Sequence, residues 1–151
     1  MNERLVPLNL PQAELKMARK GDQLMVWDNI RQKYLKLTPE EWVRQHLVHY
    51  LIQKDYPKTA LALEGGFKLL TKLRRTDILV YKSQKPWMII ECKAPQVRIS
   101  QHTFDQALQY NMHYGVPFIL ISNGLEHYTA RVVHEEKRLE FLETIPSYDQ
   151  I

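Results

Sequence analysis

The most informative segment for the fold is Pro-Trp-Met-Ile-Ile-Glu-Cys-Lys-Ala-Pro, residues 86–95. The four apolar residues in its first half are typical of an interior strand that is covered on both faces. Its second half is charged, because Glu91 and Lys93 flank Cys92. Alternate side chains of a strand point to the same side, so Glu91 and Lys93 should project together while Cys92 faces away. We therefore expect a buried strand that ends in a carboxylate–ammonium pair.

The segments around this strand predict a mixed α/β fold. Residues 38–41, Thr-Pro-Glu-Glu, carry the signals of a helix start, with a capping threonine, an early proline and a glutamate that can complete a capping box. Ser100 or Thr103 can cap a second helix, which Gly115 would stop. The expected order is a helix, a three-strand antiparallel meander, a crossover helix and a strand, at residues 38–54, 61–69, 76–81, 87–93, 100–115 and 117–121.

The remaining segments extend this core at both ends. Residues 1–37 are interpreted as an accessory segment, in which the Lys-Gly-Asp turn at 20–22 predicts a short hairpin and residues 28–34 a short helical turn. After the core, the Asn-Gly turn at 123–124 predicts returning strands. The expected division of the chain is an accessory segment at 1–37, a catalytic core at 38–122 and C-terminal strands within 123–151, near 127–133 and 138–142.

Composition supports a single folded domain. The chain has 151 residues, of which 44% are hydrophobic, enough for one core. Only five glycines and eight prolines are present, which excludes disordered and collagen-like classes. No apolar run approaches the roughly 18 residues of a membrane span, and the first ten residues lack the layout of a signal peptide. We therefore expect a cytoplasmic protein without membrane contacts, in which the lone Cys92 forms no internal disulfide.

A second acidic residue should join the charged pair. The hairpin formed by residues 76–81 and 87–93 can place Asp77 opposite the end of the longer strand. Between residues 68 and 85, six basic residues surround Asp77, the only acid there, and such a stretch can attract a polyanion such as nucleic acid. The predicted phosphate contacts are Lys72, Arg74 and Arg75.

Two carboxylates and a lysine indicate metal-assisted hydrolysis. With no histidine or thiolate ligand beside them, Asp77 and Glu91 suit a hard cation such as Mg²⁺ or Mn²⁺, to which the main-chain carbonyl of Cys92 can add a ligand. A cation held there can activate a bound water and stabilise the leaving oxygen of a phosphodiester, while Lys93 orients that water. The competing interpretation is that Glu91 and Lys93 face solvent at a strand end and that Asp77 merely begins a strand.

Asp77 followed by Glu91-Cys92-Lys93 resembles the motif of the PD-(D/E)xK nucleases. The next helix agrees, since Gln106-x-x-x-Tyr110 is similar to the glutamine–tyrosine signature of the branch that includes RecB-type nucleases. Four short segments resemble the N-terminal nuclease domain of the type I restriction enzyme motor (R) subunit. These segments are residues 38–42, 90–95, 104–106 and 122–124. The resemblance spans about residues 24–142 and implies a restriction-endonuclease-like mixed sheet flanked by helices.

The resemblance also implies roles for individual residues. Asp77 and Glu91 would be metal ligands, and Lys93 would position the attacking water. Glu41 matches a glutamate that this branch carries on the helix before the sheet, which makes it a candidate supporting acid. Thr76 stands where the motif's name has proline, and many members lack that proline.

Three implied residues have alternative interpretations. Gln106 and Tyr110, four apart on one helix stripe, would contact DNA or steady the site. However, Glu41 can simply close its capping box, Gln106 can do the same with Thr103, and Tyr110 can belong to the core.

The function that these features predict is hydrolysis of DNA by a Mg²⁺- or Mn²⁺-dependent endonuclease. The alternative is a catalytically silent DNA-binding or assembly module that acts with a partner protein. Expected partners are DNA and a helicase or another restriction-system subunit, because the chain has no Gly-x-x-x-x-Gly-Lys phosphate loop for using ATP itself. A homodimer would help to cut both strands, but no interface signature predicts one.

Other candidate residues have structural explanations. His46 and His49 lie three apart without a His-Glu-x-x-His pattern, so we expect surface or interface histidines rather than a zinc pair. The Ser-Asn-Gly sequence at 122–124 is interpreted as a turn. Cys92 is interpreted as buried packing rather than as a nucleophile.

Overall fold

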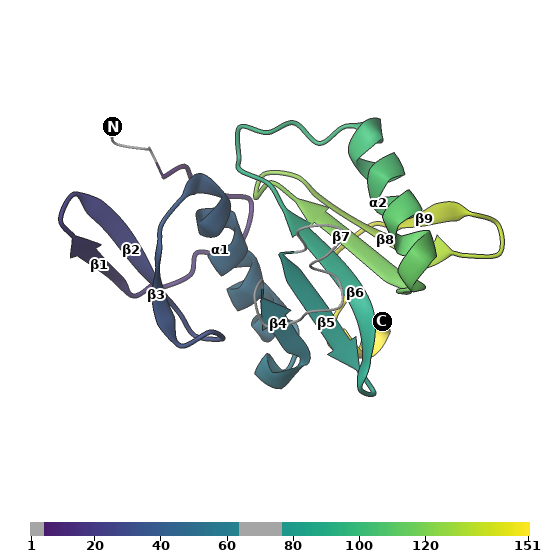
Figure 1. Ribbon diagram of the computed structural model, residues 1–151, viewed down its shortest axis with the longest axis horizontal. Coiled ribbons are helices and arrows are strands. Elements are labelled where there is room, and N and C mark those ends of the chain that lie inside the picture. The colour runs from purple at the N-terminus through teal and green to yellow at the C-terminus, as the bar shows by residue number, and fades with distance from the viewer. Residues whose placement is uncertain (1–4, 64–76) are drawn as a thin grey trace.

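A computed structural model describes residues 5–63 and 77–151, except for the side chains of Tyr110, His113 and Tyr114. These described residues form a small three-stranded sheet, a larger six-stranded mixed sheet and two α-helices (Figure 1). The small sheet contains β1 (Met17–Lys20), β2 (Gln23–Asp28) and β3 (Lys33–Lys36). The helices are α1 (Pro39–Gln53) and α2 (Gln101–Tyr114), and short 3₁₀ turns cover Lys58–Ala60 and Tyr148–Gln150. The large sheet contains, in spatial order, β4 (Leu61–Leu63), β5 (Ile78–Lys82), β6 (Lys85–Cys92), β7 (Phe118–Ser122), β8 (His127–Val133) and β9 (Arg138–Leu142).

The large sheet confirms the expected α/β topology. The β4, β5 and β6 strands form an antiparallel meander, α2 then crosses over, and β7 pairs parallel to β6. The β8 and β9 strands continue the sheet in antiparallel order, at the residues that the Asn-Gly turn predicted. The fold is therefore a mixed sheet with its parallel pair at the centre, which places the charged end of β6 between strands on both sides.

The two helices cover opposite faces of this sheet. On one face, α1 packs against residues that include Met88, Ile90 and Leu120. On the other face, α2 packs against Ile119 and Ile121, the neighbours of Leu120 along β7. This alternation explains why β6 and β7 are apolar at successive positions, since each face meets a helix.

The start of α1 follows its sequence signals. The Thr38 hydroxyl accepts a hydrogen bond from the backbone N–H of Glu41 at 3.0 Å, and Pro39 occupies the first helical position. The helix ends at Gln53, one residue before the expected end at 54. Within α2, Ser100 occupies the N-cap, and Gly115 takes the left-handed conformation with φ of 69° that ends the helix.

The helical turn expected at residues 28–34 is wrong. The structure has a strand, a tight turn and another strand there, so β2 and β3 form a hairpin. The Asp28 carboxylate accepts hydrogen bonds from the backbone N–H groups of Ile30 and Arg31. These bonds stabilise the turn that reverses the chain between β2 and β3. Trp27 then faces Tyr34 across the hairpin, with ring centroids 5.1 Å apart.

The strand expected over residues 61–69 begins as predicted with β4. Its remainder, with the glycine bend, lies in 64–76, outside the described residues, as do the predicted phosphate contacts Lys72, Arg74 and Arg75. No helix in the two described segments is long and apolar enough to cross a bilayer.

Candidate active site

The register of the central hairpin positions Asp77. Ile78 pairs with Ile90, so Asp77 lies one residue before β5, level with the charged end of β6. One oxygen of its carboxylate, Oδ2, accepts a hydrogen bond of 2.7 Å from the backbone N–H of Cys92. The other, Oδ1, accepts from the guanidinium of Arg44 on α1. Asp77 is only 5% exposed, so its carboxylate is a buried and fully oriented group.

Glu91 and Lys93 project together as the alternation of the strand predicts. The ammonium Nζ of Lys93 lies 3.0 Å from Oε1 of Glu91. Glu91 is buried, with 8% of its surface exposed, and the backbone N–H of Lys93 is fixed to the carbonyl oxygen of Ser122. The competing interpretation that Glu91 and Lys93 both face solvent at a strand end is therefore wrong for Glu91, whereas the side chain of Lys93 is 32% exposed.

Cys92 points to the opposite face, where it joins the core beneath α1. Burial raises the pKa of its thiol well above the ordinary value, and the nearby Asp77 carboxylate acts in the same direction. Because the thiolate is the reactive form, this environment agrees with the interpretation of Cys92 as packing rather than as a nucleophile.

Glu41 is part of a buried ionic cluster rather than only a helix cap. Its carboxylate accepts hydrogen bonds from Arg44 at 2.7 Å, Arg31 at 3.2 Å and the side-chain amide of Gln45 at 3.2 Å. The backbone N–H of Glu41 is capped by Thr38, but its carboxylate is directed to the arginines. The interpretation that Glu41 only closes a capping box is therefore wrong.

Arg44 joins Glu41 to Asp77. Its guanidinium donates Nη1–H to Glu41 and Nη2–H to Asp77, and it lies within 3.3 Å of Glu40. Burial lowers the pKa of the Arg44 guanidinium, but the attraction of the Asp77 and Glu41 carboxylates is the stronger effect. The pKa of the guanidinium is therefore raised above its ordinary value. Arg44 therefore stays charged and holds both acids.

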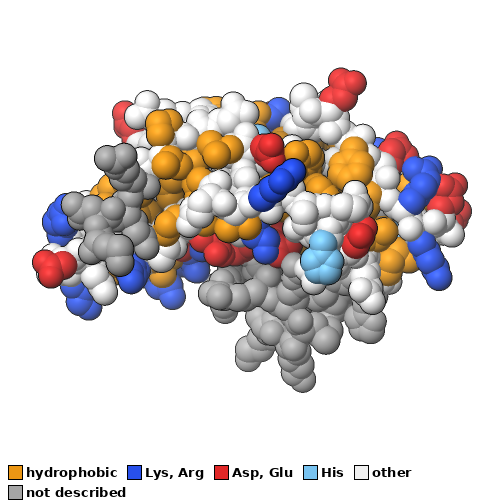
Figure 2. Space-filling view, turned by 90° about the horizontal axis from the view of Figure 1, so that it is seen from above, with side chains coloured by type: hydrophobic (Ala, Val, Ile, Leu, Met, Phe, Trp, Pro, Cys, Tyr) orange, Lys and Arg blue, Asp and Glu red, His pale blue; other side chains and the backbone are white. Residues whose placement is uncertain are grey.

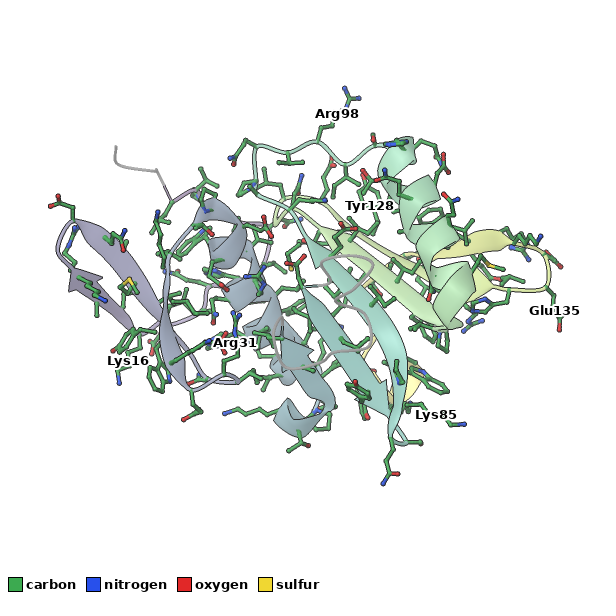
Figure 3. The ribbon with its side chains drawn as sticks, in the orientation of Figure 1. Lys16, Arg31, Lys85, Arg98, Tyr128 and Glu135 are labelled. Carbon is green, nitrogen blue, oxygen red and sulfur yellow. The ribbon has the colours of Figure 1, made fainter. Side chains whose placement is uncertain are left out.

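The cluster continues into the small sheet through Asp28 and Arg31. Asp28 is 1% exposed, and its Oδ2 accepts from Nε of Arg31 at 2.8 Å and from Gln45 at 3.2 Å. Burial would raise the pKa of the Asp28 carboxyl, but the backbone and side-chain hydrogen bonds from Arg31 outweigh it and hold this pKa below its usual value. Figure 3 shows Arg31 beside α1, between the small sheet and the large one.

These supporting residues are not among those predicted from the sequence. Arg44 lies one turn after Glu41 and one turn before Leu47 and Val48, so it is a charged residue on a helix face that continues as apolar. That position was the available signal, because a buried arginine requires carboxylate partners. Asp28 gave no comparable signal, since its hairpin was read as a helical turn.

Other predicted residues lie apart from this cluster. Gln106 is exposed on α2, and among the described residues no hydrogen bond joins it to Asp77, Glu91 or Lys93. The side chain of Tyr110 lies outside the described residues. The turn at 122–124 is structural, since the Asn123 side chain accepts hydrogen bonds from the backbone N–H groups of residues 125 and 126.

His46 differs from its expected surface position. It is 4% exposed, its ring centroid lies 4.2 Å from that of Trp42, and its Nδ1–H donates to the Trp42 carbonyl oxygen at 2.9 Å. The side of α1 that carries His46 is covered by residues 5–13 of the N-terminal segment, which together with Trp42 line a pocket of about 420 Å³. His49 is half-buried.

The carboxylate oxygens of Asp77 and Glu91 are the type of ligand that a hard divalent cation prefers. Within the two described segments, no group of three His, Cys, Asp or Glu side chains is arranged to hold a metal ion. The site supplies the carboxylates of Asp77 and Glu91 instead, and Mg²⁺ needs only one or two carboxylates when water and substrate oxygens complete its shell. A carboxylate has about four lone-pair positions, so the two donors on Asp77 leave acceptor capacity.

These features define an α/β domain with a buried acid–lysine site at the end of its central antiparallel hairpin. Residues 39–146 match the family described as the type I restriction enzyme R protein N terminus, and the chain belongs to that family. The match begins at the first residue of α1, so the small sheet precedes it. A search of curated proteins found no match. A search of solved structures found none either.

Proposed function

We propose that this chain is a Mg²⁺-dependent nuclease of the PD-(D/E)xK type that hydrolyses phosphodiester bonds in DNA. The observation that carries the proposal is that adjacent strand ends carry the buried Asp77 carboxylate, which accepts from the backbone N–H of Cys92, and the Glu91–Lys93 ion pair on either side of Cys92. Membership in the restriction R-protein family supports DNA as substrate and restriction-system subunits as partners.

The metal would be held by Asp77 and Glu91, with the Cys92 carbonyl as a further oxygen donor. A bound divalent cation supplies Lewis-acid chemistry, which polarises a phosphoryl oxygen and makes water more acidic. The role of the protein is to present two charged oxygens in fixed positions, and the backbone N–H of Cys92 orients the Asp77 carboxylate for that purpose.

Lys93 is the candidate for handling the attacking water. Its side chain is 32% exposed, whereas the side chain of its partner Glu91 is 11% exposed, so the ammonium group reaches solvent while its carboxylate partner is buried. A lysine there can donate a hydrogen bond to a water and offset the negative charge that develops on a phosphoryl oxygen. The 3.0 Å contact with Glu91 keeps the ammonium at the metal-binding carboxylate.

Arg44 is assigned a positioning role. It fixes the Asp77 carboxylate from the α1 side, and Glu41 fixes Arg44 in turn. Glu41 therefore acts on the proposed site through Arg44.

The test is cleavage of supercoiled, linear and single-stranded DNA with Mg²⁺, Mn²⁺ or a chelator. We expect metal-dependent cutting by the wild type and a loss of at least about a hundredfold in Glu91→Gln and Lys93→Ala. The matched controls are Glu143→Gln and Lys137→Ala, which change the same residue types at exposed positions and should cut like the wild type.

Two outcomes would overturn the proposal. Cutting that persists equally in Glu91→Gln and Lys93→Ala would place the activity elsewhere or in a contaminant. DNA binding without any cutting and without any effect of metal would identify a silent binding module instead.

A further inference from the structure

The outward face of the small sheet has an unusual composition. Strand pairing places Trp27 opposite Tyr34, Met25 opposite Lys36, and Lys20 opposite Gln23. The backbone N–H of Trp27 donates to the carbonyl oxygen of Lys16, which extends the pairing by one position. Because alternate residues share a face, this face consists of Lys16, Ala18, Lys20, Gln23, Met25, Trp27, Tyr34 and Lys36.

Burial shows which face of the sheet is free. The opposite face carries Val26 and Asp28, which are 0% and 1% exposed, and Asp28 belongs to the ionic cluster on α1. On the outward face, the three lysines are exposed and Tyr34 is 38% exposed. The small sheet lies at one end of the molecule (Figure 1), so this face borders solvent rather than the large sheet.

The face is positively charged. It carries Lys16, Lys20 and Lys36 and no acidic residue, and the nearest acid in the hairpin, Asp22, lies in the turn between β1 and β2. Figure 2 shows basic side chains gathered at this end of the molecule. With strands about 4.8 Å apart and a rise of about 3.4 Å per residue, the lysines span roughly 14 by 10 Å.

One end of the face is aromatic, because Trp27 and Tyr34 form the row beside Lys16. The Trp27 and Tyr34 rings meet edge to face, and Nζ of Lys16 lies 5.1 Å from the Trp27 centroid and 5.8 Å from the Tyr34 centroid. Trp27 is half-buried and Tyr34 is exposed, and Lys16 and Lys36 are the neighbouring basic residues on this face. Rings beside lysines match the requirements of a single nucleic-acid strand, whose bases stack on rings while its phosphates contact ammonium groups.

We propose that this face binds a single strand of nucleic acid, with phosphates on the three lysines and a base against Trp27 and Tyr34. The choice of DNA as the strand rests on the proposed function, whereas the face itself is defined by its own charge and rings. The inner side of the same sheet carries Asp28, which is bonded to Arg31 and through it to Glu41. A nucleic-acid strand on this face would therefore be bound by the small sheet, which is joined through these ion pairs to the ionic cluster beside the candidate site.

The test measures the binding of a fluorescent oligothymidylate of about 20 nucleotides to the full chain, by anisotropy, in chelator so that no cleavage can occur. The triple variant Lys16→Gln, Lys20→Gln, Lys36→Gln is compared with a control, Lys58→Gln, Lys85→Gln, Lys137→Gln. Both variants remove three exposed lysines and the same net charge.

We expect the face variant to bind at least about tenfold more weakly and the control to bind like the wild type. The salt dependence should also decrease, by about 2 in the slope of log affinity against log salt, because each single-strand phosphate contact contributes about 0.7. Tyr34→Leu should weaken binding about fivefold or more, whereas Tyr34→Phe, which keeps the ring, should not.

Three results would overturn the inference. Equal losses in the two triple variants would show a general charge effect. Equal binding of heparin with no effect of Tyr34→Leu would show attraction of any polyanion. Tighter binding of duplex than of single-stranded DNA would show that bases do not reach the rings. A separate titration with an oligouridylate of the same length compares RNA with DNA. Because no cleavage is measured, these results do not depend on whether Glu91 and Lys93 catalyse hydrolysis.

Discussion

Arg44 on α1 and Asp77 before β5 form a buried ion pair, although 33 positions separate them in the chain. Each side chain is less than a tenth exposed, so neither charge has water as an alternative partner. The pair fastens the helix to the end of the central hairpin, where the Asp77 carboxylate also accepts from the backbone N–H of Cys92. It therefore contributes to stability and orients a residue of the candidate site at the same time.

Replacing Arg44 should destabilise the fold strongly. Arg44→Met leaves the buried Asp77 and Glu41 carboxylates without their shared cation, and we expect a loss of about 3–5 kcal/mol in the free energy of unfolding. Urea unfolding followed by circular dichroism measures the loss. Arg138→Met, which removes an arginine paired with Glu136 at an exposed site, is the control and should unfold like the wild type. A small effect of Arg44→Met would show that the pair does not hold the helix.

The Glu41 carboxylate should contribute more to the stability of the fold than the Thr38 cap of α1 does. Thr38→Ala removes the hydroxyl that caps α1 and should cost about 1 kcal/mol. Glu41→Gln keeps the backbone cap but removes the buried carboxylate that Arg31 and Arg44 share, and should cost about 3 kcal/mol. The same urea titration compares the two variants. If Thr38→Ala proves the more damaging, Glu41 acts mainly at the helix start after all.

The sequence predicted the large sheet well because its signals are local. The apolar run before Glu91, the Asn123-Gly124 turn and the helix stop at Gly115 each depend on residues near one another in the chain. The pairing of Glu91 with Lys93 followed from strand alternation, and the placement of Asp77 followed from the hairpin.

The ionic cluster and the small sheet are harder to predict from the sequence. Arg44 finds its partner 33 residues away, and no periodicity in the sequence reports such a contact. The hairpin between β2 and β3 is hard to predict because Asp28 and Asn29 suit both helix N-caps and turns, and the deciding interaction is the hydrogen bonding of the Asp28 side chain to the backbone.

Asp28 should make the stability depend on pH in the acid range. Its folded-state pKa is below the usual value of about 3.9, so its ion pair stabilises the fold above that pH and is lost as the pH falls through the lower pKa. We expect Asp28→Asn to be less stable than the wild type at pH 7 and this difference to shrink below about pH 4. Urea unfolding at several pH values measures it. A difference that stays constant with pH would mean that the carboxylate charge is not involved.

Cys92 should be unreactive in the folded protein. Burial raises the pKa of its thiol, so little thiolate exists near neutral pH, and the side chain lies in the core. A chromogenic disulfide reagent at about pH 8 should react slowly with the native chain and rapidly after unfolding in urea. Rapid reaction of the native chain would contradict the buried position and reopen a chemical role for the thiol.

Gly124 should tolerate substitution worse than Gly21, although both have positive φ, at 85° and 60°. A Cβ at Gly124 would lie 2.7 Å from Cδ2 of Leu8 and 3.0 Å from Cγ2 of Val43, whereas one at Gly21 would meet nothing within 4 Å. Gly21→Ala therefore has the backbone cost alone, about 1–2 kcal/mol, and Gly124→Ala should cost about 1–3 kcal/mol more through overpacking. Thermal unfolding of the two variants measures the difference. Equal losses would show that the N-terminal segment around Leu8 moves aside freely, whereas a larger loss at Gly124 would show that this segment is packed firmly against the turn after β7.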